Sequence, residues 1–257
     1  MASNDQSGSA SALDPVRMIA DARRALFTMV GVMAVVWLLQ LVNWLDDYGL
    51  SRAYGVRPQD LGSLPHIVTS PLLHWNWAHL EANSGPLFVF GFLAAYRGVK
   101  KFLGLTALLA VTSELTAWVF DKPNSIGVGA SGLVFGYFGY VVLRGVFDRN
   151  LIDTLIGVVL GASYAYMVTG ALPGVAPGIS WAAHLGGLVG GLAGAWIFRN
   201  REPKAAAPKP ATTGTTTGTT TGTTTRTAAT RTAAGPGTPA VPGSRAELLK
   251  ELDDLGL

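Results

Sequence analysis

Four polar residues that could together hydrolyse an amide or ester bond lie in three apolar segments. His79 and Asn83 are four residues apart, Ser131 stands in a Gly-x-Ser-Gly segment, and His184 opens a glycine-rich stretch. A serine hydroxyl becomes a nucleophile when a base accepts its proton, and His184 is the candidate base. N–H groups of His79 and Asn83, with the backbone N–H of Ser131, are candidate donors to the oxyanion that forms on attack.

Glycines surround the candidate pair. Gly129 and Gly132 flank Ser131, and Gly187 and Gly191 follow His184 at four-residue spacing. Small residues at this spacing let membrane helices approach to near backbone contact. The chemistry requires such closeness, because nucleophile and base must come within about 2.6–3.2 Å.

The composition indicates that apolar helices position these residues. The 257 residues are 49% hydrophobic and 14% charged, a balance that argues against an ordinary soluble enzyme. A bilayer takes about 20 apolar residues per helix. Six runs fit this length: 26–45, 75–96, 102–120, 128–146, 151–169 and 181–198. We therefore expect an all-α membrane protein with a six-transmembrane-helix bundle.

The positions of lysine and arginine predict the orientation of this bundle. Short cytoplasmic loops collect positive charge. With the N-terminus inside, twelve Lys and Arg residues fall in inner segments, and three, Arg52, Arg57 and Lys122, fall in outer loops. Both termini are then cytoplasmic, and the polar starts of the second, fourth and sixth spans lie at similar depth in the outer leaflet.

The sequence predicts four parts. Residues 1–24 form a partly disordered cytoplasmic segment in which Asp14 and Pro15 signal a helix start. Residues 25–199 form the six-span domain, with loop 170–180 as a cap over the site. Residues 200–242 form a disordered Thr/Gly/Pro-rich linker. Residues 243–257 form a short amphipathic helix that begins at the capping box Ser244–Glu247.

Other chemistries are also open on the residues alone. His74, His79 and His184 form an alternative metal site, because imidazole suits zinc. The segment from His79 lacks the second histidine of a His-Glu-x-x-His metalloprotease. The chain has no cysteine, which excludes thiol catalysis, disulfides and Cys-ligated zinc. We assign no catalytic role to Glu81, expected at the surface, or to Glu114, expected to be paired in the bundle or near its outer rim. We find no partner for His66.

Over about residues 26–198 the sequence resembles the rhomboid intramembrane serine proteases. The resemblance rests on three motifs in family order: His74-x4-His79-x3-Asn83, Gly129-x-Ser131-Gly132, and Ala183-His184-x2-Gly187-x3-Gly191.

The resemblance implies a six-helix bundle that cuts single-span membrane proteins in or next to the bilayer, without metal or cofactor. Ser131 would be the nucleophile and His184 the base and then the acid. His79 and Asn83 would be oxyanion donors beside Gly129, and His74 a structural or water-organising residue. We expect a bacterial plasma membrane, a site that opens to the outer face, and no nucleic-acid partner. The oligomeric state is left open.

The sequence departs from the family pattern at two places. Where many rhomboids carry a Trp-Arg pair in the first outer loop, this chain has Leu64-Pro-His66. Four residues after Ser131, some relatives carry a tyrosine beneath the catalytic histidine, whereas this chain has Phe135, which keeps the ring and loses the hydroxyl. Two alternatives to a protease stay open: a non-catalytic client-binding membrane chaperone, and a histidine-based metal or ion transporter.

Overall fold

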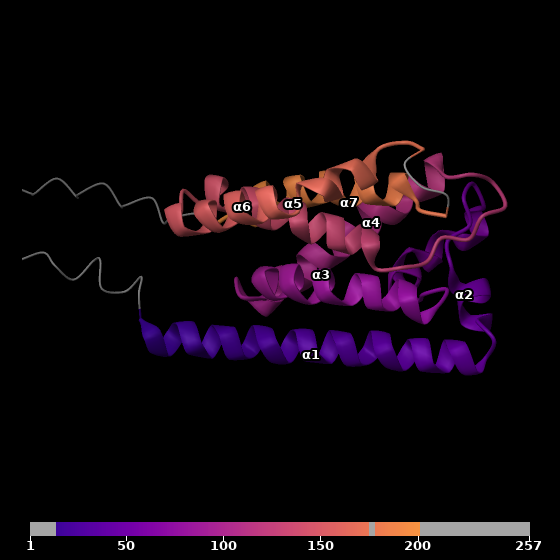
Figure 1. Ribbon diagram of the computed structural model, residues 1–257, viewed down its shortest axis with the longest axis horizontal. Coiled ribbons are helices and arrows are strands. Elements are labelled where there is room, and N and C mark those ends of the chain that lie inside the picture. Colours follow the sequence, from indigo (N-terminus) through magenta and orange to yellow (C-terminus); the bar gives the residue numbers. More distant parts are fainter. Residues whose placement is uncertain (1–13, 175–177, 201–257) are drawn as a thin grey trace, which may run out of the picture. The chain divides into compact units, whose positions relative to one another are not determined.

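The computed structural model describes residues 14–174 and 178–200, and its long helices fall on the predicted apolar runs (Figure 1). They are α1 (Pro15–Leu45), α3 (Trp77–Ala95), α4 (Val99–Phe120), α5 (Ser131–Phe147), α6 (Leu151–Ser163) and α7 (Trp181–Ile197). Within the described residues there is no strand, only one isolated bridge between Val56 and Gly127. The all-α expectation is confirmed.

Helix α1 begins earlier than the predicted span. Asp14 caps it by accepting the N–H of Val16 at 3.0 Å, and Pro15 occupies the first turn, as the sequence signal predicts. The helix runs unbroken from Pro15 to Leu45, through the predicted boundary at residue 24. That boundary marks where the membrane span begins and stays a prediction. Residues 16–30 contain neither glycine nor proline, so no residue interrupts the backbone hydrogen bonds there.

The predicted fifth span is bent. Helix α6 ends at Ser163, and the chain turns by 65° into the 3-10 helix η4 (Ala165–Ala171). Among the described residues, two helices are long and apolar enough to cross a membrane, α1 and α4, or three if α6 and η4 are one span. Helices α5 and α7 have 17 residues each, slightly fewer than the about 20 that a straight span needs. The six-span count therefore stays a prediction.

Helix α5 packs against four helices, α3, α4, α6 and α7, and most of its residues are buried. Its contact with α7 is made by glycines. Gly187 of α7 lies on the carbonyl oxygen of Gly132, and Gly191 lies on that of Gly136, so that neither position has room for a Cβ atom. The two helices meet at backbone contact, as the glycine spacing predicts.

A compact loop joins α1 to α3. It contains α2 (Gly49–Tyr54) and the 3-10 helices η2 (Leu61–Val68) and η3 (Ser70–Leu72). Buried Asn43 near the end of α1 holds this loop, because its amide nitrogen donates to Ser51 Oγ at 2.8 Å and to the carbonyl of His74 at 2.9 Å. The loop is thereby fixed to both helices that it connects.

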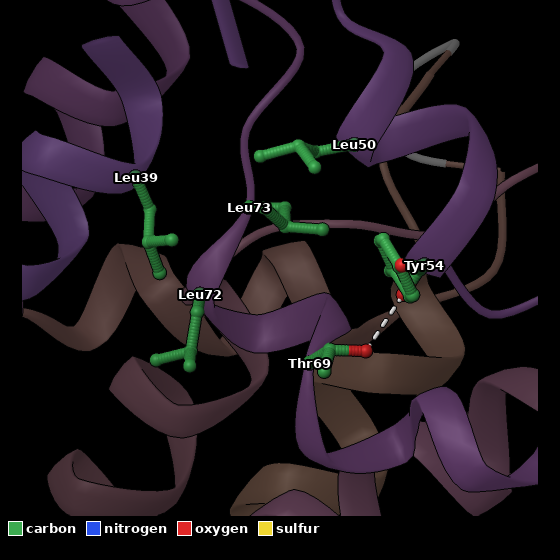
Figure 2. A pocket seen from close by; sticks show the side chains of 6 residues that line it. All are labelled: Leu39, Leu50, Tyr54, Thr69, Leu72 and Leu73. Atoms are coloured by element: carbon green, nitrogen blue, oxygen red, sulfur yellow. Dashed lines mark hydrogen bonds between the residues drawn. The ribbon is translucent and has the colours of Figure 1, made fainter. Parts of the chain in front are cut away.

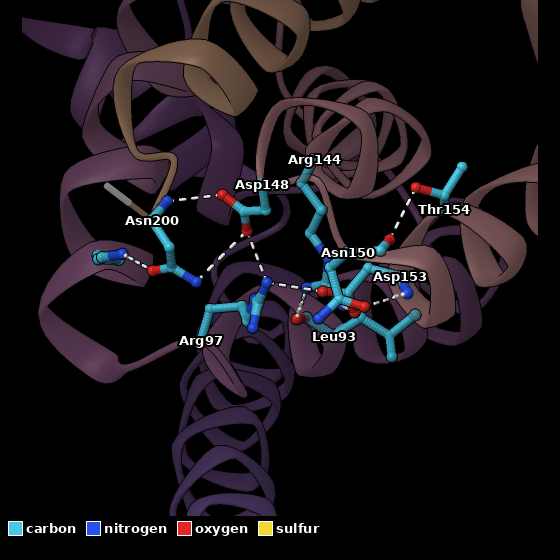
Figure 3. Close-up of polar contacts among 9 residues, drawn as sticks. Leu93, Arg97, Arg144, Asp148, Asn150, Asp153, Thr154 and Asn200 are labelled. Carbon is cyan, nitrogen blue, oxygen red and sulfur yellow. Dashed lines mark hydrogen bonds and ion pairs between the residues drawn. The ribbon is translucent and has the colours of Figure 1, made fainter. Parts of the chain in front are cut away.

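A cluster of charged side chains joins the C-terminal ends of α3 and α5 to the start of α6 (Figure 3). Arg97, just after α3, donates to Asp148 and to Asp153, at 2.6 Å in each case. Arg144 of α5 donates to Asp153 at 3.1 Å and to the carbonyl of Leu93. Removing one partner from such a cluster leaves a buried charge uncompensated, so the cluster constrains the three helices together.

The predicted linker, apart from Asn200, and the predicted C-terminal helix at 243–257 lie outside the described residues. So do residues 1–13 and the middle of the predicted cap, 175–177.

Candidate active site

Ser131 is the first residue of α5 and is partly buried. Gly129, two residues earlier, has a φ of +129°, a conformation that side chains rarely adopt. Among the residues that the structure describes, the Ser131 hydroxyl makes no hydrogen bond. The structure therefore does not join Ser131 directly to His184.

His184 lies in the first turn of α7 and is buried. Its Nδ1 is 2.9 Å from the carbonyl oxygen of Gly170 in η4. A carbonyl oxygen can only accept, so Nδ1 carries the proton and Nε2 keeps a free lone pair. The ring of Phe135 stacks on the imidazole, with centroids 3.9 Å apart and an interplanar angle of 10°. Both contacts fix the plane of the candidate base.

The two helix starts are held together by the residues next to the candidate pair. Gly132 follows Ser131, and its carbonyl oxygen touches Gly187, one turn after His184. A Cβ atom on Gly132 would lie 3.4 Å from the carbonyl oxygen of Ala183, the residue before His184. The turns that carry Ser131 and His184 therefore face each other across a backbone contact.

His79, on α3, contacts the segment that leads into α5. A Cβ atom on Gly129 would lie 2.7 Å from Cε1 and 2.9 Å from Nε2 of His79, so the imidazole lies directly on this glycine. Asn83 is buried, and its amide nitrogen donates to the carbonyl of His79 at 3.1 Å. In this state the Asn83 donor is used within its own helix.

His74 binds the segment that precedes Ser131. Its Nε2 accepts the N–H of Ala130 at 3.3 Å, and the carbonyl of Ser70 accepts the N–H of Gly129 at 2.9 Å. Because Nε2 accepts, the ring is neutral with its proton on Nδ1, which has no partner in the described part of the chain. The His74 and His79 rings meet edge to face at 5.0 Å.

The histidines do not form the alternative metal site. Within residues 14–174 and 178–200, no group of three His, Asp or Glu side chains could hold a metal ion. His74 and His184 each direct a ring nitrogen to a backbone group, Ala130 N–H and the Gly170 carbonyl respectively.

Three polar contacts bear on what the sequence predicts for His184, Glu114 and His66. The residue pattern predicts no partner for His184 besides Ser131, since it places Gly170 only in a cap loop. Glu114 is buried and accepts from Ser70 Oγ at 2.6 Å, which agrees with the expected pairing in the bundle. His66 does have a partner, because its Nδ1 lies 3.0 Å from the carbonyl oxygen of Gly55.

One further contact concerns the start of α7. Burial raises the pKa of Asp121, which follows α4, and a hydrogen bond with Ser180 opposes that rise. Ser180 is the residue that caps α7, accepting the N–H of Ala183 at 2.9 Å. The helix start that carries His184 is thus joined to the end of α4.

These features define a helical protein in which the helix turns that carry a serine and a histidine pack against each other through glycines. The Rhomboid domain family matches residues 62–201, more than half of the 257-residue chain. The chain belongs to the rhomboid family, and the family together with the apolar helices makes it a membrane protein.

Two relatives with rhomboid names agree with this assignment, and a third relative is uncharacterized. An uncharacterized protein of Mycobacterium tuberculosis is 36% identical over 149 residues, which are 55% of this chain and 62% of the relative. The rhomboid protease GlpG of Haemophilus influenzae is 25% identical over 144 residues, 52% of this chain and 73% of the relative. Rhomboid-like protein 11, chloroplastic, of Arabidopsis thaliana is 37% identical over 93 residues, 35% of this chain and 33% of the relative. The chain thus spans less than two thirds of the mycobacterial relative.

Proposed function

We propose that this protein is an intramembrane serine endopeptidase that hydrolyses peptide bonds in or next to transmembrane segments of single-span proteins. The observation that carries the proposal is the backbone contact between Gly132 and Gly187, which sets the turn of Ser131 against that of His184. Because His184 Nδ1 donates to the Gly170 carbonyl, Nε2 is the ring nitrogen that can accept the serine proton. In the proposed mechanism, rotation of the Ser131 side chain brings its hydroxyl to His184 Nε2.

The reaction follows from these roles. Ser131 Oγ attacks the scissile carbonyl carbon while His184 Nε2 takes the hydroxyl proton, and the carbonyl oxygen becomes an oxyanion. His184 then gives the proton to the leaving amine, which leaves an acyl ester on Ser131. A water molecule, deprotonated by His184, hydrolyses the ester and restores the serine. The Ser131–His184 hydrogen bond forms with substrate, since catalytic hydrogen bonds often tighten only in that complex.

The oxyanion would be held where α3 meets the start of α5. His79 lies on Gly129, and Asn83 is one helical turn further along α3. The Ser131 N–H, in the first turn of α5, is available because the first amides of a helix have no partner within the helix. To serve the oxyanion, the Asn83 amide leaves the His79 carbonyl and turns toward the substrate.

In the membrane, the proposed bundle has six spans with both termini cytoplasmic, and the site opens to the outer face of a bacterial plasma membrane. Substrate helices enter sideways from the lipid. Peptide bonds in a helix are shielded by their own hydrogen bonds, so the cleaved segment contains glycine, proline or other weak helix formers.

The test is cleavage of a single-span reporter in liposomes by the purified full-length protein. We expect chelator-resistant cleavage by the wild type and none by Ser131→Ala. Ser125→Ala is the matched control, because this exposed serine lies six residues before Ser131 and its hydroxyl donates only to the Lys122 carbonyl among the described residues. It should cleave like the wild type. Wild-type activity in Ser131→Ala would refute the mechanism.

One observation favours a second candidate function, the client-binding chaperone without catalysis. Among the described residues, Ser131 and His184 share no hydrogen bond. A fluorophosphonate probe separates the two, since covalent labelling requires an activated serine. Labelling of the wild type and not of Ser131→Ala supports the protease, whereas absence of labelling and of cleavage across several reporters supports the chaperone.

A further inference from the structure

The loop between α1 and α3 forms an apolar groove against α1. The groove has a volume of about 210 Å³. Figure 2 shows its lining, in which Leu39 comes from α1, Leu50 and Tyr54 from α2, and the remaining residues from the chain around η3: Thr69, Leu72 and Leu73. It lies apart from Ser131 and His184, none of whose contacts line it.

The lining of the groove favours an apolar ligand. Four of its six lining residues are leucines. The Thr69 hydroxyl donates to the carbonyl of Tyr54 at 2.8 Å, as the dashed line in Figure 2 marks, so its proton is already used. A polar ligand that entered here would lose its hydrogen bonds to water without replacing them, which costs free energy.

Its depth places the groove in the apolar layer of the membrane. Leu39 lies six residues before Leu45, where α1 ends and the charged pair Asp46 and Asp47 follows. At about 1.5 Å per residue, Leu39 is about 9 Å from that end of the helix. Side chains from the loop therefore reach down beside α1 to a level that hydrocarbon chains occupy.

The groove also continues a surface that faces lipid. Beside Leu39, α1 exposes Leu38 at 61%, Leu41 at 42% and Val42 at 51% of their surfaces. Helix α1 is one of the helices that is long and apolar enough to span, so in this membrane protein its exposed apolar side is covered by lipid chains.

We propose that this groove binds an acyl chain of a membrane lipid. The chain leaves the lipid that covers α1, enters beside Leu39 and packs on Leu72 and Leu73. It is held by burial of apolar surface and by close packing with the leucines. This site is a property of the fold and needs no catalysis.

The same loop is in contact with the candidate active site. Ser70, next to Thr69, accepts the N–H of Gly129, and His74, next to Leu73, accepts the N–H of Ala130. The chain that lines the groove thus holds both amides that precede Ser131. A bound acyl chain therefore stabilises the position of Ser131 and raises the cleavage rate, a consequence that rests on the proposed function.

The experiment maps contacts with a phospholipid that carries a diazirine in its acyl chain. The full-length protein is reconstituted in phosphatidylethanolamine and phosphatidylglycerol vesicles with this probe, irradiated, digested and analysed by mass spectrometry. We expect labelling at Leu39, Leu72 and Leu73 to exceed, several-fold, the labelling at exposed Leu38 and Val42. Equal or weaker labelling in the groove would overturn the proposal.

A matched pair of variants on one helix tests the groove itself. Leu39→Trp fills it, whereas Leu38→Trp places the same side chain on the exposed face. Labelling of Leu72 and Leu73 should fall several-fold in Leu39→Trp and stay unchanged in Leu38→Trp. An equal effect of both variants would count against the site. If Leu39→Trp does not fold, the wild-type map alone decides.

The two proposals fail in different ways. Labelling does not depend on proteolysis, so Ser131→Ala should give the wild-type map. If Ser131→Ala still cleaves the reporter while the groove is labelled, the proposed function fails and the lipid site stands. If Leu39→Trp loses labelling but cleaves at the wild-type rate, the coupling to the active site is wrong.

Discussion

At the scale of single residues, Gly129 determines both the backbone path into α5 and the position of His79. Its φ of +129° turns the chain into α5, its N–H reaches the Ser70 carbonyl, and the His79 ring lies where a side chain would be. The backbone conformation and the contact with His79 are therefore two independent demands for glycine at one position.

We expect Gly129→Ala to destabilise the protein by about 1–3 kcal/mol through backbone strain, and to abolish cleavage by displacing His79. Unfolding in detergent and reporter cleavage measure the two effects. Gly127→Ala is the control, because its φ lies outside the glycine-favouring range and its Cβ atom would lie 3.6 Å from the Val56 carbonyl oxygen, an ordinary contact. Wild-type cleavage by Gly129→Ala would remove His79 from the oxyanion site.

Asn83→Ala should lower kcat at least about tenfold, with a smaller change in KM, because the lost donor acts on the oxyanion and not on the bound substrate. Ser84→Ala is the control on the same helix, since Ser84 also donates to the carbonyl four residues earlier, Leu80, at 2.8 Å, and in addition accepts the indole N–H of Trp37 at 3.1 Å. If lost hydrogen bonding in the helix were the cause, kcat would fall at least as much in Ser84→Ala as in Asn83→Ala. Unchanged kcat in Asn83→Ala would place the donor elsewhere.

At the scale of elements, α6 is held differently at its two ends. Near its start, Asp153 is bound to Arg97 and Arg144 (Figure 3). Past its end, the bend into η4 brings the Gly170 carbonyl to His184. The charged cluster therefore fixes the helix whose continuation orients the candidate base.

Asp153→Ala should lower the free energy of unfolding by about 3–5 kcal/mol, because buried Arg144 and partly buried Arg97 lose the carboxylate that they share. Asp21→Ala is the control: Asp21 pairs with Arg24 at 3.1 Å on the surface, and such pairs contribute about 0–1 kcal/mol. Chemical or thermal unfolding in detergent micelles measures both. A loss in Asp153→Ala no larger than in Asp21→Ala would show that the cluster does not stabilise the bundle.

At the scale of the whole molecule, the orientation in the membrane is the main open prediction. The distribution of lysine and arginine favours cytoplasmic termini. In that arrangement α4 starts inside and ends outside, and the exposed residues Lys100 and Lys122 lie on opposite sides of the membrane. The natural absence of cysteine makes this testable without background.

In intact cells, a membrane-impermeant maleimide should label Lys122→Cys, and should label Lys100→Cys only after permeabilisation. Each variant serves as the control for the other, and the cysteine-free wild type should remain unlabelled. The reversed pattern would invert the topology, and labelling of both variants in intact cells would show that α4 does not span.

The sequence by itself determined the local features of this protein. Uncharged apolar runs located the long helices, the Asp14-Pro15 pair located the start of α1, and glycine spacing predicted the close contact of α5 with α7. The signals for these features are local, because hydropathy, capping and glycine spacing each depend on residues within a few turns of one helix.

Only the tertiary structure decided which distant groups meet. The partner of His184 Nδ1 is a backbone carbonyl 14 residues away, at Gly170, and Ser70 reaches Glu114 across 44 residues. Backbone carbonyls carry no sequence signature, because every residue has one. The bend after α6 and the depth of the loop beside α1 likewise follow from packing between elements. Spacing along the chain could name the candidate residues, but the contacts that orient them arise when the helices pack.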